Sequence, residues 1–77
     1  MPKLPRLSGK DVAIVLERLG FVSVRQKGSH LILKKEFNRE AVGCVVPLHK
    51  ELATGTLHGI LRQAKIDTET FLSACKK

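Results

Sequence analysis

The chain has 77 residues, which suffice for a single domain with a thin hydrophobic core. Fourteen Lys and Arg against seven Asp and Glu leave a net charge of +7, which favours nucleic acid, an acidic membrane or an acidic protein as partner, unless the charge serves only solubility. The sequence lacks the run of roughly 20 apolar residues that crosses a bilayer, and it lacks the apolar segment of a signal peptide. Its two cysteines, Cys44 and Cys75, lie far apart and form no CxxC pattern, which predicts free thiols in a reducing, cytoplasmic location. The cysteines and the three histidines show no zinc-ligand spacing, so we expect no metal or other cofactor.

The first predicted element is a helix over residues 8–19. Ser8 is a good N-cap, and Asp11, three residues later, suits the first turn in the manner of a capping box. Gly20 can adopt the left-handed conformation that often ends a helix. Four aliphatic residues recur between these ends at helical spacing and form one apolar face: Val12, Val15, Leu16 and Leu19.

Three strands are expected after this helix. They cover residues 21–26, 29–35 and 44–48. Lys27-Gly28 is a turn signal between the first two, and residues 36–43 are polar enough to form a connecting loop. Pro47 cannot donate to a ladder, so it belongs at a sheet edge or a strand end. The short connections favour an antiparallel meander.

Two further helices complete the predicted chain. The second helix begins near residues 54–56, and the last, short helix begins at Asp67 or Thr68, with Phe71 and Leu72 folding back on the core. The second helix again carries an apolar stripe: Leu57, Ile60, Leu61 and Ala64. We therefore expect an α+β fold of order α-β-β-β-α plus a short C-terminal helix, with the helices packed on one face of a three-stranded sheet.

The second strand carries the first candidate for chemistry. If Leu31 and Leu33 pack beneath the helices, His30, Ile32 and Lys34 must point to the opposite, uncovered face, because side chains alternate along a strand. The imidazole would then be open to solvent and close to basic side chains: Arg25, Lys27, Lys34 and Lys35.

The position of His30 on the strand does not by itself indicate catalysis. A single histidine on a sheet face is more often an ordinary surface residue, and Lys34-Lys35 is by default a solvated pair. The other histidines are equally ambiguous. His49 follows the third strand, where its ordinary role would be to cap or hydrogen-bond a loop, and His58 is expected to pack at the edge of the core.

Several motifs along the chain, at particular separations, support a catalytic role for His30. They are Ser8-Gly-Lys-Asp-Val12, Leu19-Gly-Phe21, Arg25-Gln-Lys-Gly-Ser-His30, Val46-Pro-Leu-His49, Gly55-Thr-Leu-His-Gly-Ile-Leu-Arg-Gln-Ala64 and Phe71-Leu72. In this arrangement the chain resembles the HicA (YcfA-like) family of small toxins that cut messenger RNA. The resemblance covers about residues 8–72, the expected core of a single domain over residues 1–77.

The resemblance implies a fold similar to double-stranded-RNA-binding domains, inhibition by a HicB-like antitoxin, and a catalytic role for the histidine of Gly-Ser-His, here His30. We hypothesise that His30 acts as general base or acid in a metal-independent cleavage that leaves a 2′,3′-cyclic phosphate and a 5′-hydroxyl. The candidate RNA- and phosphate-binding residues are Arg25, Lys27, Gly28, Ser29, Lys34 and Lys35. We expect the free toxin to be monomeric and the antitoxin to cover the face that carries His30.

Two questions stay open at this stage. The second proton-transfer group can be Lys27, Ser29, water, or His49 if the fold brings it near. The alternative functions are an RNA-binding module of the same fold without catalysis, and a domain whose basic face only binds an acidic protein.

Overall fold

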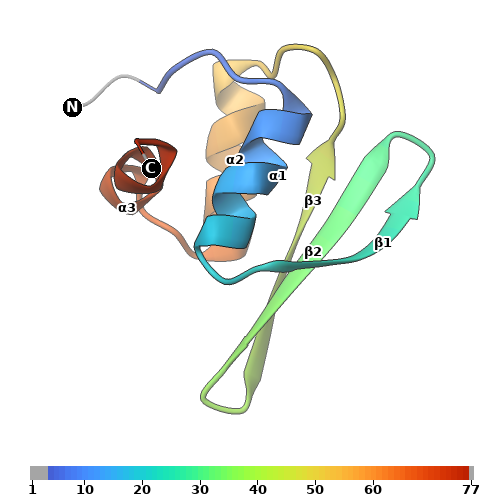
Figure 1. Ribbon diagram of the computed structural model, residues 1–77, viewed down its shortest axis with the longest axis vertical. Helices are drawn as coiled ribbons and strands as arrows, with labels where there is room; N and C mark the ends of the chain where they lie inside the picture. Colours follow the sequence, from blue (N-terminus) through green and yellow to red (C-terminus); the bar gives the residue numbers. More distant parts are fainter. Residues whose placement is uncertain (1–3, 77) are drawn as a thin grey trace.

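The computed structural model describes residues 4–76 and shows one helix, three strands and two further helices. The elements in chain order are α1 (Gly9–Arg18), β1 (Val22–Lys27), β2 (His30–Phe37), β3 (Glu40–Pro47), α2 (Thr54–Ala64) and α3 (Thr68–Cys75). This order confirms the predicted α+β fold (Figure 1). No helix in the described part of the chain has the length and apolar character that a membrane span requires.

Helix α1 begins at the predicted capping box. The backbone N–H of Asp11 donates to Oγ of Ser8 over 3.0 Å, and the backbone N–H of Ser8 donates to Oδ2 of Asp11 over 3.3 Å. At the other end, Gly20 has a φ of 101°, a conformation that favours glycine and ends the helix. The local sequence therefore specifies both ends of α1.

The three strands form one antiparallel meander in the order β1-β2-β3. Gly28 and Ser29 form the two-residue turn between β1 and β2, and Gly28 at its first position has a φ of 60°, as a type II′ hairpin turn requires. Asn38 and Arg39 form the turn between β2 and β3, and both have positive φ, 48° and 67°, as in a type I′ turn.

The second hairpin corrects the expected loop at residues 36–43. Strand β2 runs on to Phe37 and β3 starts at Glu40, so only Asn38 and Arg39 lie outside the ladder. The polar side chains of this segment misled the loop prediction. Residues 36–41 are all exposed, so the strands here need no apolar residues.

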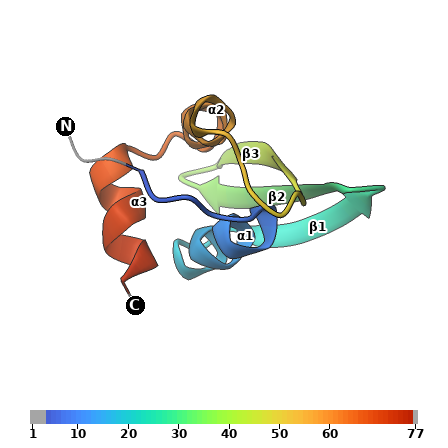
Figure 2. The same cartoon turned by 90° about the horizontal axis from the view of Figure 1, so that it is seen from above.

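Helices α1 and α2 lie side by side on one face of the sheet, and α3 lies beyond the sheet next to α1 (Figure 2). The predicted stripe of α2 is buried, as are Leu33 and Val46 of the sheet, and Phe71 of α3 is fully buried while Leu72 is half-buried. No helix among residues 4–76 covers the opposite face of the sheet (Figure 2). This open face is where the side chains opposite to Leu33 must point.

Pro47 lies at the end of the edge strand β3, as its missing N–H predicts. It pairs with His30, and the next residue, Leu48, extends the ladder by one bond from its N–H to the carbonyl of Ser29 over 2.7 Å. In an antiparallel ladder the residue beside a bonded pair points its own N–H away from the neighbouring strand. The proline therefore costs the sheet no hydrogen bond.

Candidate functional site on the open face of the sheet

Side chains on the open face of the sheet form rows that run across the strands, and three of these rows lie near His30. Residues directly opposite one another in an antiparallel sheet point to the same face. The pairing gives these rows: Lys27–His30–Pro47, Arg25–Ile32–Val45 and Val22–Lys34–Gly43. They point away from the helices, because the residues between them on β2 include the fully buried Leu33.

His30 is the first residue of β2 and its side chain is exposed. Its direct neighbour on β1 is Lys27, and residues paired in this way have Cβ atoms about 5 Å apart. Arg25 and Lys34 belong to the next two rows, and both are exposed. The three rows contain three cations and no carboxylate, and the next row of the same face holds Glu36, so the surface around His30 is locally electropositive. The structure therefore places His30 and its predicted basic neighbours Arg25, Lys27 and Lys34 together.

A β-bulge in β1 decides the position of Arg25 and Lys27. The pairing with β2 shifts between Ser23 and Arg25, which leaves Val24 as an extra residue. Phe21, just before β1, is buried under the helices. Strict alternation from Phe21 would turn Arg25 and Lys27 towards the helices as well, whereas the extra residue turns both to the face of His30. The sequence contains no signal for this bulge.

The turn before His30 leaves its backbone accessible. A Cβ atom on Gly28 would meet no other atom within 4 Å, and both Gly28 and Ser29 are exposed. The amide Nε2 of Gln26 donates to the carbonyl of Gly28 over 3.1 Å, and the carbonyl of Ser29 accepts from Leu48. The turn is thus held by its carbonyl groups, with open space around it where a phosphate can approach.

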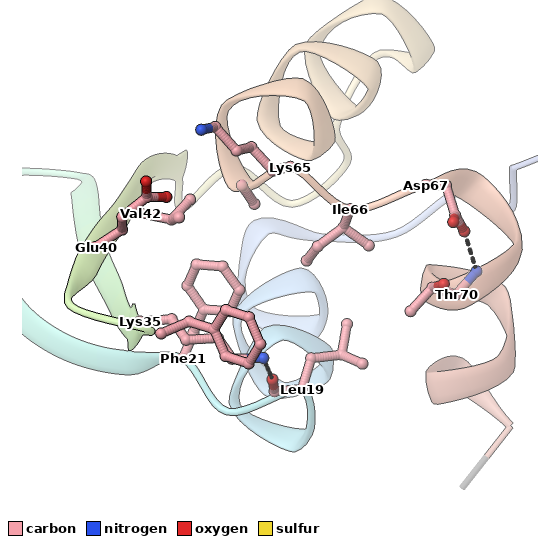
Figure 3. Close-up of a pocket in the computed structure, with 11 residues that line it drawn as sticks. Leu19, Phe21, Lys35, Glu40, Val42, Lys65, Ile66, Asp67 and Thr70 are labelled. Carbon is pink, nitrogen blue, oxygen red and sulfur yellow. Dashed lines mark hydrogen bonds between the residues drawn. The ribbon is translucent and has the colours of Figure 1, made fainter.

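Lys35 does not belong to this site, and its expected position beside His30 is wrong. It shares the helix-facing side of β2 with Leu33, and its Nζ donates to the carbonyl of Leu19 over 2.7 Å. The same Nζ lies 5.9 Å from the centre of the Phe21 ring (Figure 3). The ammonium group thus compensates the negative end of α1, beside a cleft of about 340 Å³.

The other two histidines occupy different surroundings. His49 follows β3 with an exposed side chain, and its carbonyl accepts from the N–H of Gly9 over 2.9 Å. His58 is exposed on α2, so the expectation that it packs at the edge of the core is wrong. Its helix lies on the far side of the sheet from His30 (Figure 2).

Neither cysteine is a candidate nucleophile. Burial raises the pKa of the Cys44 thiol to about 11, which keeps it protonated and unreactive at neutral pH. Burial also raises the pKa of Cys75, against the smaller opposing effect of Arg18. In the described part of the chain no three His, Cys, Asp or Glu side chains gather where they could hold a metal ion.

Comparison with known proteins identifies one family. The family model described as the HicA toxin of bacterial toxin–antitoxin systems matches residues 9–66. No curated protein matches the chain. The matched segment runs from the start of α1 through α2, and the three rows near His30 lie within it.

Proposed function

The chain belongs to the HicA toxin family of bacterial toxin–antitoxin systems, and from this premise we propose that it is an endoribonuclease that cleaves messenger RNA with His30 as a catalytic residue. The observation that supports this proposal is the exposed imidazole of His30 on an uncovered sheet face, in rows that also hold Arg25, Lys27 and Lys34. A messenger-RNA substrate implies that the toxin works in the cytoplasm.

RNA brings its own nucleophile, the 2′-hydroxyl next to each phosphate. Attack of the 2′-oxygen on phosphorus forms a 2′,3′-cyclic phosphate, and the bond from phosphorus to the 5′-oxygen breaks. One proton leaves the 2′-hydroxyl and one proton joins the 5′-oxygen, so the reaction needs a base and an acid but no co-reactant. Imidazole suits either task, because its ordinary pKa is about 6.5.

The cations of the open face would stabilise the charge that develops on the phosphate. Lys27 is the direct neighbour of His30, and Arg25 and Lys34 extend the positive surface along the sheet. The exposed turn at Gly28 and Ser29 provides a backbone that a phosphate can approach closely. Because this chemistry uses only side chains and the substrate's own hydroxyl, we expect cleavage to persist in excess EDTA and to spare RNA analogues that lack the 2′-hydroxyl.

The direct test is induced expression of the wild type and of His30→Ala without antitoxin, with growth and messenger-RNA integrity followed together. We expect growth arrest and RNA loss with the wild type only, and unchanged toxicity in His58→Ala, which removes an exposed histidine from the opposite side of the sheet. Intact RNA in cells that contain soluble, folded wild-type protein would contradict the proposal. RNA binding without cleavage would then indicate a non-catalytic RNA-binding module.

The same face is suited to a HicB-like antitoxin. It exposes apolar side chains next to the cations: Val22 and Val45 are 61% and 39% exposed. An antitoxin that buries these residues would occlude His30 directly. We expect the amides of residues 25–35 to become protected from hydrogen exchange in the complex, with the amides of α3, which lies away from the open face, as internal reference. Unchanged exchange at residues 25–35 would exclude this mode of inhibition.

A further inference from the structure

The proposed reaction moves two protons, and His30 accounts for one of them. If the proposed function holds, a second group must transfer the other proton. Lysine ordinarily titrates near pH 10.4 and imidazole near pH 6.5, so a second imidazole is better suited than Lys27 to exchange a proton at neutral pH. The question is therefore whether another histidine is held at the same end of the sheet.

The end of β3 brings His49 to the turn that precedes His30. Pro47 is the direct partner of His30, and the N–H of Leu48 donates to the carbonyl of Ser29 over 2.7 Å. His49 is the next residue along the chain. Residues 47–49 therefore run alongside residues 29–30, although about 20 positions separate them in the sequence.

A second contact holds the same segment from the other side. The N–H of Gly9, at the start of α1, donates to the carbonyl of His49 over 2.9 Å. The approach is so close that a Cβ atom on Gly9 would collide with the carbonyl oxygen of Pro47 and lie 2.8 Å from Cα of Leu48. Only glycine allows α1 to contact the chain here without displacement.

These contacts fix the backbone of His49 while its side chain stays exposed. The backbone is bonded to β2 through its neighbour Leu48 and to α1 through its own carbonyl. A catalytic side chain needs a precisely held backbone, and its functional group must also be accessible to the substrate. His58 has an exposed side chain as well, but it lies on a helix on the far side of the sheet.

We propose that His49 is the second proton-transfer group of the ribonuclease site. One imidazole removes the proton of the 2′-hydroxyl as the bond from the 2′-oxygen to phosphorus forms. The other gives a proton to the 5′-oxygen as its bond to phosphorus breaks. The 2′,3′-cyclic phosphate and the 5′-hydroxyl leave, and proton exchange with water restores both imidazoles.

The test compares purified wild type, His30→Gln, His49→Gln and the control His58→Gln on a short RNA, across pH 4.5–9. We expect a bell-shaped profile of kcat/KM for the wild type and for His58→Gln. Each of the other two variants should lose about 10²-fold or more in kcat/KM and should lose a different limb of the bell. Because the side chain of His49 is exposed, the thermal melting curve of His49→Gln should match that of the wild type.

A second substrate separates the two roles. In an RNA whose scissile 5′-oxygen is replaced by sulfur, the leaving group no longer needs a proton. Cleavage of this substrate should recover in whichever variant lacks the acid, and in that variant only.

The inference is overturned if His49→Gln stays within about threefold of the wild type, if both variants lose the same limb, or if the sulfur substrate rescues both or neither. Absence of cleavage by folded wild-type protein is a different outcome. It would remove the proposed function itself, and the role of His49 with it.

Discussion

Gly9 begins α1 where the backbone of the helix contacts the backbone of the segment that follows β3. The helix start, the carbonyl of Pro47 and the carbonyl of His49 come together there, and the space left for a side chain is smaller than one methyl group. In the sequence, Gly9 reads only as the residue after an N-cap. Glycine is needed there because the helix start contacts Pro47, 38 positions later in the sequence, and no local pattern reveals this contact.

We expect Gly9→Ala to lower the free energy of unfolding by about 1–3 kcal/mol, because the added methyl group overpacks this contact. Gly59→Ala is the matched control. It lies inside α2 with nothing within 4 Å of a built Cβ atom, so alanine there should raise stability by about 0.5–1 kcal/mol. Urea unfolding of both variants measures the two effects. A Gly9→Ala variant as stable as the wild type would contradict the close packing.

At the scale of secondary-structure elements, short polar segments determine where each element begins and how it is oriented. The type II′ turn at residues 28–29 places Lys27 opposite His30, and the bulge at Val24 aligns Arg25 with the same face. Helix caps act similarly at α1 and α3. At α3, Oδ1 of Asp67 accepts from the backbone N–H of Thr70 over 2.7 Å.

The cap of α3 predicts a pH dependence of stability. The hydrogen bonds from the backbone and side chain of Thr70 lower the pKa of Asp67 below its ordinary 3.8, so its stabilising effect is present above that value and is lost as the pH falls through the lowered pKa. The melting temperature of the wild type should exceed that of Asp67→Ala at neutral pH, and the difference should shrink below about pH 4.

Asp67→Asn supplies the control for this effect. Asparagine caps helices about as well as aspartate but does not titrate. Its advantage over Asp67→Ala should therefore not decline in acid in the same way. An equal decline for both caps would show that the loss has a different origin.

At the scale of the whole molecule, basic residues are numerous, but only a few of them lie near His30. Each contact with a phosphate of single-stranded RNA contributes about −0.7 to the slope of the logarithm of the binding constant against the logarithm of the salt concentration. If all fourteen basic residues made such a contact, the slope would be about −10. The open face offers three cations in the rows around His30, which correspond to a slope of about −2.

Lys34 and Lys35 test this view with adjacent residues of equal charge. Lys34→Ala should weaken RNA binding and make the salt slope shallower by about 0.7. Lys35→Ala should leave the slope unchanged and instead lower the free energy of unfolding by about 1 kcal/mol, since it removes the hydrogen bond to Leu19. Binding titrations at several salt concentrations and urea unfolding distinguish the two. Equal changes of slope in both variants would place RNA contacts on both faces of β2.

The sequence alone determined the order and type of the elements, the apolar faces of α1 and α2, and the outward direction of His30. These features depend on periodicity and on caps and turns made by neighbouring residues, so a local pattern contains the information. The family resemblance rests on motifs that are likewise readable along the chain, and the family match at residues 9–66 confirms it.

Only the tertiary structure decided which other groups join His30. The bulge at Val24 turned Arg25 and Lys27 to its face, whereas alternation along β2 placed Lys35 on the opposite one, where its ammonium group meets the end of α1. The hydrogen bond from Leu48 to Ser29 and the bond that the His49 carbonyl accepts from Gly9 held His49 beside the same turn. Strand register and close backbone packing join residues far apart in the sequence, and their energies depend on the whole fold rather than on any local run of side chains.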